Sequence, residues 1–192
     1  MWTPEHARKV AFECLSGLGR RWQHVCAVGE LAEALAADGL TENCVVMAAW
    51  LHDLGYAEEL QFTGFHPLDG ARYLAGEGAP REVVALVAHH TGAAYEAQER
   101  GLAAELNLMP VADPKALDVL TLLDLVTSPD GRRINPGDRV AEILARYPET
   151  SPVFRAVSRS GSSLVSAAER ARAQLGLADD WPAGVGECMR EA

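Results

Sequence analysis

Residues 45–51 are apolar at every position and lead directly into His52 and Asp53, with Gly55 two residues further on. A helix that is apolar on all sides belongs in the centre of a protein, so the pattern predicts a central helix at about 42–54. Neighbouring helical residues point about 100° apart, which aims the imidazole and the carboxylate at two sides of one small volume. Such ligands suit Zn, Fe, Mn and related ions, although a bare His-Asp pair is also common at surfaces.

The other histidines favour the metal-site interpretation. Five of the six histidines lie at or near the ends of predicted apolar helices: His24, His52, His66, His89 and His90. Asp124 lies inside a leucine-rich helix, where an ionised carboxylate needs a cation or hydrogen-bond donors. His90 continues the apolar stripe of its helix by steps of three and four residues, so we expect it, rather than His89, to face the interior.

The spacing of apolar residues and of capping signals predicts an all-α fold. The expected helices are 4–16, 20–37, 42–54, 66–76, 80–91, 93–104, 114–127, 138–147 and 152–175. Convincing strand alternation, internal repeats and a domain linker are not found in the sequence. We therefore expect one domain over 1–192.

The composition excludes several classes of partner. The formal net charge is -10, which argues against a general affinity for the backbone of nucleic acids or for an anionic membrane. The sequence shows neither an apolar run near 18 residues nor the apolar stretch of a signal peptide. The four cysteines lack a C-x-x-C spacing, so we expect them to be reduced, in a soluble and cytoplasmic protein.

Five short stretches resemble the HD superfamily, whose members are typically metal-dependent phosphohydrolases. They are RWQH at 21–24, AAWLHDLG at 48–55, HPLDGA at 66–71, HHTG at 89–92 and LLD at 122–124. The resemblance is closest to the branch that hydrolyses diadenosine tetraphosphate and related nucleotides. The resemblance covers about 18–130 and implies a single-domain helical bundle of the HD type. Its metal core would lie at about 18–130, with C-terminal helices, 138–175, packed on that core.

The resemblance also implies a set of metal ligands. His24, His52, Asp53 and Asp124 would hold a first divalent ion, with Asp53 bridging to a second one. Two further histidines make the chain similar to the dinuclear subset of the superfamily, and they would complete the second site: His66 and His90. Two ions per chain, of iron, manganese or a similar metal, are therefore expected.

The expected activity is hydrolysis of a nucleotide or another small phosphoester by a metal-activated hydroxide, which Asp53 would orient or deprotonate. Three residues are candidate substrate contacts, namely His89, Arg21 and Arg132, although the arginines could simply be solvated. One departure weakens the case for a polyphosphate, because the nucleotide-hydrolysing branch usually has lysine where this chain has Tyr56.

Two other functions fit the same residues. Mixed-valent di-iron oxygenases of the superfamily use much the same six ligands, so the ligands alone do not separate oxidation from hydrolysis. A non-catalytic HD module for ligand sensing is the remaining alternative, although such modules usually lose ligands. The sequence leaves the oligomeric state open.

Overall fold

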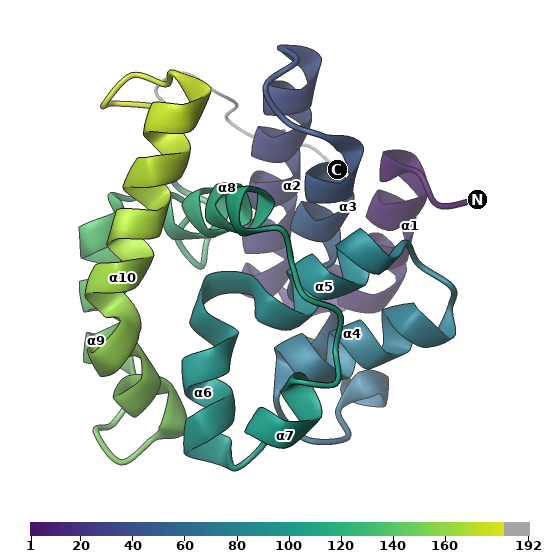
Figure 1. The fold of residues 1–192 in the computed structure, drawn as a ribbon, viewed down its shortest axis with the longest axis vertical. Coiled ribbons are helices and arrows are strands. Elements are labelled where there is room, and N and C mark those ends of the chain that lie inside the picture. Colours follow the sequence, from purple (N-terminus) through teal and green to yellow (C-terminus); the bar gives the residue numbers. More distant parts are fainter. Residues whose placement is uncertain (183–192) are drawn as a thin grey trace.

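The computed structural model describes residues 1–182, and these form a bundle of helices without a β-strand (Figure 1). The α-helices are α1 (Pro4–Leu15), α2 (Arg20–Ala37), α3 (Asn43–Leu51), α4 (His66–Gly76), α5 (Arg81–His89), α6 (Ala93–Arg100), α7 (Ala103–Leu106), α8 (Pro114–Leu125), α9 (Pro136–Arg146) and α10 (Pro152–Leu175). Short 3₁₀ turns lie at Ser16–Leu18 (η1), Leu54–Tyr56 (η2), Glu58–Leu60 (η3) and His90–Gly92 (η4). The predicted all-α fold is confirmed.

Local signals explain most helix boundaries. Four helices begin at a proline that follows a side-chain cap, and the caps are Thr3, Asp113, Asn135 and Ser151. A capping oxygen accepts a hydrogen bond from a backbone N–H that has no partner within the first turn of the helix. The cap at Asn135 starts α9 at Pro136, two residues before the predicted start. Gly101 takes a left-handed conformation after α6, and this splits the predicted helix 93–104 into α6 and α7.

Helix α3 lies at the centre of the bundle, as the sequence predicts. It packs against α1, α2, α5 and α8, and residues 45–51 are all buried. The helix ends at Leu51 rather than at residue 54, because the chain turns after His52 into η2. This turn packs tightly on α4, where a Cβ atom on Gly55 would lie 2.2 Å from the His66 carbonyl oxygen. Glycine is therefore the residue that this close approach permits.

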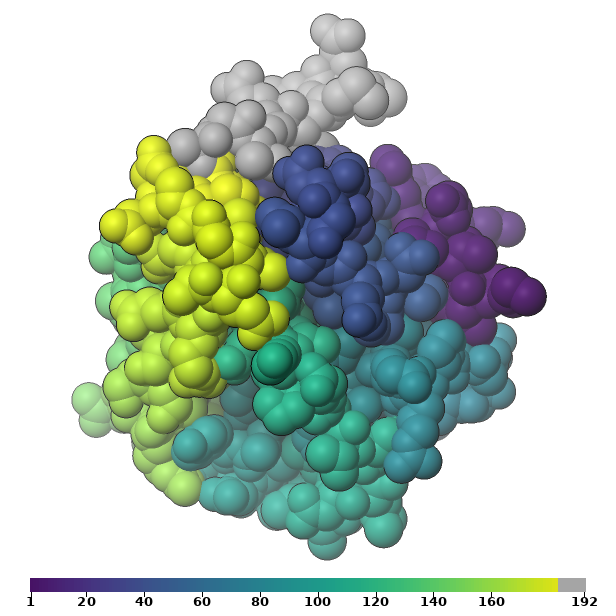
Figure 2. All heavy atoms as spheres, turned by 45° about the horizontal axis from the view of Figure 1, so that its top comes forward, coloured from purple at the N-terminus to yellow at the C-terminus, as the bar shows by residue number. Residues whose placement is uncertain are grey.

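The C-terminal helices cover one flank of the core. Helix α10 packs on α8, α6 and α9, and Gly161 of α10 lets Val140 of α9 approach closely. In the space-filling view, α1 and the end of α10 lie on opposite sides of the turn between α2 and α3 (Figure 2). Among the residues that the structure describes, none of the helices is long and apolar enough to cross a membrane. No disulfide joins Cys14, Cys26 and Cys44, and Cys188 lies outside the described residues.

Candidate metal centre

Five separate elements bring six imidazole and carboxylate side chains into one small region. The side chains come from α2 (His24), the turn directly after α3 (His52 and Asp53), the start of α4 (His66), η4 (His90) and α8 (Asp124). All of them are buried except His66, whose side chain is 16% exposed. The structure therefore brings together the six residues that the sequence proposes as metal ligands.

The first group of ligand atoms lies on one side of Asp53. His24 Nε2 and His52 Nε2 are 3.3 Å apart. Asp53 Oδ2 lies 3.5 Å from the His52 nitrogen and 3.9 Å from the His24 nitrogen. The three residues each offer an atom within 4.8 Å of the others, a spacing at which one ion can be held.

A second group uses the other oxygen of the same carboxylate. Asp53 Oδ1 lies 3.3 Å from His66 Nε2, and this nitrogen is 3.2 Å from His90 Nε2. These three residues also offer ligand atoms within 4.8 Å of one another. Asp53 thus presents one oxygen to each pair of histidines, as a bridging carboxylate does.

Asp124 extends the first group. Its Oδ1 atom lies 3.1 Å from His24 Nε2, and its Oδ2 atom accepts a hydrogen bond of 2.5 Å from the Thr91 hydroxyl. Thr91 adopts a left-handed backbone with φ 41° and ψ 50°, which is rare for a β-branched residue. Such strain costs about 1–3 kcal/mol, and it tends to be retained where it serves a site.

Backbone carbonyls fix the orientation of three imidazole rings. The Nδ1 atoms of His24, His52 and His90 lie 3.1, 2.8 and 2.7 Å from the carbonyl oxygens of Ser128, Ala49 and Val87. A carbonyl oxygen only accepts, so each Nδ1 carries a hydrogen, and each ring turns its Nε2 atom toward the cluster. Metal-bound histidines usually show this arrangement, in which the ring nitrogen away from the metal is held by a backbone carbonyl.

The loop before α4 holds His66 in place. Asp69, buried in the first turn of α4, accepts hydrogen bonds from the Thr63 N–H, the Thr63 hydroxyl and the Gly64 N–H. These bonds tie the loop to the helix that His66 begins. Gly55 packs against the backbone of His66, so the first residue of α4 is held both by the preceding loop and by Gly55.

The electrostatics of the cluster favour metal-binding protonation states. Burial raises the pKa of Asp53, but Arg21 and the neighbouring imidazoles outweigh burial and hold the pKa well below its usual range. Burial also raises the pKa of Asp124, yet His24 lowers it overall. The pKa values of His66 and His90 are lowered, mainly by burial. Ionised carboxylates and neutral imidazoles are the forms that bind divalent ions.

An arginine and a tyrosine border the cluster. Arg21 Nη1 donates to Asp53 Oδ2 at 2.6 Å, and its guanidinium lies 3.9 Å from the centre of the Tyr56 ring. Tyr56 in turn stacks on His66, with ring centres 4.1 Å apart. Burial raises the pKa of Tyr56, so its hydroxyl stays protonated. Arg21 therefore places a positive charge directly beside the carboxylate that joins the two groups.

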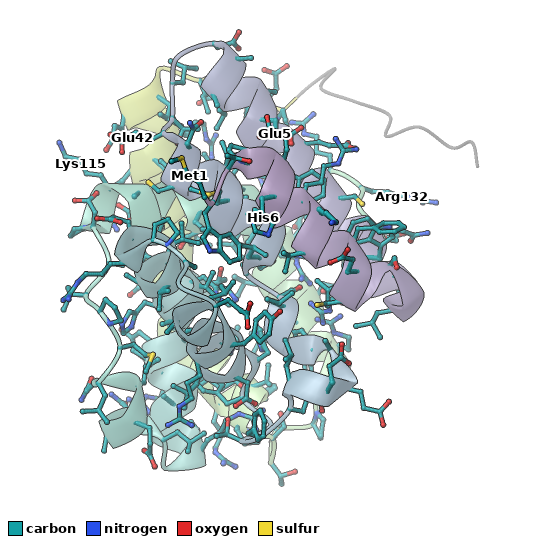
Figure 3. All side chains as sticks on the ribbon, turned by 90° about the vertical axis from the view of Figure 1, so that its right-hand side faces the viewer. Met1, Glu5, His6, Glu42, Lys115 and Arg132 are labelled. Atoms are coloured by element: carbon teal, nitrogen blue, oxygen red, sulfur yellow. The ribbon has the colours of Figure 1, made fainter. Side chains whose placement is uncertain are left out.

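The other two candidate substrate contacts lie away from these six side chains. The His89 ring donates from Nε2 to the Pro110 carbonyl oxygen at 3.1 Å, and burial lowers its pKa. Arg132 is 77% exposed at its side chain, pairs with Asp130 and extends from the surface (Figure 3). His6, the sixth histidine, is exposed on α1 and stacks on Trp2.

Three contributors to the site were not expected from the sequence. Thr91 and the Ser128 carbonyl orient ligands, and the charge of Arg139 on α9 adds to the lowering of the pKa of Asp124. The position of Thr91 directly after a candidate ligand was a usable signal. The role of a backbone carbonyl cannot be predicted from the pattern of side chains. In the sequence, Arg139 has the pattern of an ordinary charged residue on an amphipathic helix.

Comparison with protein families agrees with this geometry. The family model for the HD domain matches residues 21–121, more than half of the chain. The chain belongs to the HD-domain family. The match contains five of the six cluster residues, and Asp124 follows just beyond it. A search of curated proteins and of solved structures found no match. HD-domain proteins are generally metal-dependent hydrolases, and the His/Asp groups of this chain could hold a metal.

Proposed function

We propose that this HD-domain protein is a phosphohydrolase that uses two divalent ions to cleave a nucleotide or another small phosphoester. One observation carries the proposal: the two oxygens of Asp53 face two separate pairs of imidazoles. His24, His52 and Asp124 would complete the site on one side of Asp53, and His66 and His90 the site on the other. Iron, manganese or a similar ion fits this mixture of imidazole and carboxylate ligands.

Two such ions, when bound, supply a hydroxide nucleophile near neutral pH and offset negative charge on the phosphate. Asp53 would then orient the nucleophile rather than remove its proton, because both of its oxygens face the groups of ligands. During hydrolysis, an oxygen from water forms a bond to phosphorus as the bond to the leaving oxygen breaks. The leaving oxygen takes up a proton, and the products are an alcohol and a phosphate.

Arg21 favours a phosphorylated substrate. Its guanidinium lies on the ring of Tyr56, the residue that stands where the nucleotide-hydrolysing branch usually has lysine. Arg21, from α2, thus places a positive charge next to position 56, where this chain lacks the lysine that is usual in that branch. Guanidinium groups bind phosphate oxygens through two parallel N–H donors, and Arg21 is 26% exposed at its side chain and so open to a ligand.

The test combines metal analysis with turnover. Protein purified without oxygen or chelator should contain close to two metals per chain, and it should hydrolyse members of a panel of phosphomonoesters, phosphodiesters and nucleotides. Oxygen consumption that depends on reduced iron, without phosphoester cleavage, would replace the proposal with a di-iron oxygenase. Retention of no metal and turnover of no substrate would point to a non-catalytic HD module.

A further inference from the structure

Helix α9 buries a charged residue where an outer helix normally buries aliphatic ones. Arg139 is 5% exposed, while Val140, Ile143 and Leu144 of the same helix are only partly buried. Arginine is almost never fully buried unless it is paired. The helix also lies beyond residues 21–121, so the family comparison assigns nothing to it.

The buried guanidinium is only partly satisfied. Arg139 Nη1 donates to Glu142 one turn further along α9, and Glu142 is shared with Arg146, whose Nε lies 3.5 Å from Oε1. Arg139 Nε is the one buried side-chain nitrogen or oxygen within residues 1–182 that has no hydrogen-bond partner. A buried donor on a charged group is costly to leave unpaired, so an acceptor is missing at this position.

The position of α9 indicates where that acceptor belongs. The helix packs on α8, which carries Asp124, and the N–H of Ile134, two residues before α9, donates to the carbonyl of Val126, two residues after Asp124. Helix α9 therefore begins beside the end of α8 that carries Asp124. Arg139, buried in the first turns of α9, lies on the side of the first group of ligands.

We propose that Arg139 is an anion-binding residue, and that Arg139 and Arg21 together select a substrate with a terminal, doubly charged phosphate group. The proposal rests on the proposed function and names its substrate class. A terminal phosphate has three free oxygens, enough for the metal centre and for two guanidiniums from separate helices. A phosphodiester has two free oxygens and a single negative charge, so it is the poorer ligand.

The direct test measures binding of inorganic phosphate to the metal-loaded, full-length protein by calorimetry. At equal metal loading, checked by elemental analysis, and at a temperature where both proteins are folded, Arg139→Gln should weaken phosphate binding about tenfold or more. Arg146→Gln is the matched control, because it removes a guanidinium that also contacts Glu142 but is more exposed. It should change phosphate binding less than about twofold. Equal phosphate binding by Arg139→Gln and the wild type would overturn the proposal.

A second variant keeps the test decisive if Arg139→Gln folds poorly or loses metal. Glu142→Gln leaves Arg139 in place and removes the carboxylate that competes with the anion for its donors. It should tighten phosphate binding about threefold or more, because a charged hydrogen bond no longer has to be given up. Unchanged or weaker phosphate binding by Glu142→Gln would count against an anion site at Arg139.

Turnover separates this inference from the proposed function. If the enzyme cleaves phosphoesters, Arg139→Gln should raise KM for a phosphomonoester more than for a phosphodiester, whereas a purely structural change would affect both alike. Equal effects on the two substrates would overturn the inference and leave the phosphohydrolase standing. Binding of phosphate that depends on Arg139, without any hydrolysis by the wild type, would retain the anion site and overturn the proposed function.

Discussion

The polar side chains of the metal centre and those that hold α10 against the bundle are arranged in opposite ways. At the metal centre, imidazoles and carboxylates are buried, and backbone carbonyls orient three of the rings. Along α10, three guanidiniums that are 43–62% exposed pair with carboxylates of neighbouring helices: Arg155 and Arg159 with Glu99, and Arg170 with Asp118. Water competes for the second kind of pair, which therefore contributes little to stability.

The same contrast holds for the backbone. Helix α10 is regular from its cap at Ser151 to the left-handed Gly176, whereas the metal centre includes the strained Thr91 and the tight approach of Gly55 to α4. Burial of ionisable groups and backbone strain both cost free energy. A cation held by these His and Asp side chains would offset that cost, and nothing comparable is needed along α10.

The largest effect is expected when the carboxylate of Asp53, which both groups of ligands share, is removed. We expect Asp53→Ala to lose both metals and all activity, because its two oxygens face both groups of ligands. Elemental analysis and circular dichroism should show a helical protein without bound metal. Asp118→Ala, which breaks an exposed pair with Arg170, is the control and should keep its metal. Full metal content in Asp53→Ala would mean that the centre lies elsewhere.

A more selective change should distinguish the two groups of ligands. His66→Ala is expected to lower the metal content from about two ions to about one, since His66 contacts only the second group. His89→Ala should leave the metal content unchanged, because its ring donates to the Pro110 carbonyl. Two retained metals in His66→Ala would show that His66 is not a ligand.

The hydroxyl of Thr91 should have a smaller effect. Thr91→Val keeps the shape of the side chain but leaves Asp124 Oδ2 without its donor, so metal affinity should fall about tenfold. Thr91→Ser keeps the hydroxyl and should bind metal nearly as tightly as the wild type. Titration of the metal-free protein would measure both affinities. Equal affinities of Thr91→Val and Thr91→Ser would make the hydroxyl irrelevant to the site.

The smallest effect is expected on the outer helix. Glu99→Gln removes the carboxylate that pairs with both Arg155 and Arg159, yet these side chains stay hydrated. The melting temperature should change only slightly, and metal content should not change. A large loss of stability, measured by thermal unfolding, would show that the exposed ion pairs contribute substantially to the stability of the fold.

Most of the fold could be predicted because its signals are local. Caps and prolines mark where helices begin, and the apolar run at 45–51 places α3 in the centre. The end of α3 was predicted three residues too late in the chain. The position of the turn at Gly55 depends on the packing of η2 against α4. Contacts between distant segments do not appear in a local pattern.

The identity of the candidate ligands was likewise available from the sequence by itself. An imidazole or a carboxylate at or near the end of an apolar helix needs a partner, which made these residues candidates, and the resemblance to the HD superfamily then supplied the set of six ligands. Only the tertiary structure gave the distances that set one oxygen of Asp53 against each pair of histidines, and decided that Arg21 rather than Arg132 borders the cluster. It also decided that Arg139 lies buried on α9, which packs on the helix of Asp124. The physical reason is that the distances between these side chains depend on how helices from distant parts of the chain pack against one another. The local sequence of a single helix does not determine that packing.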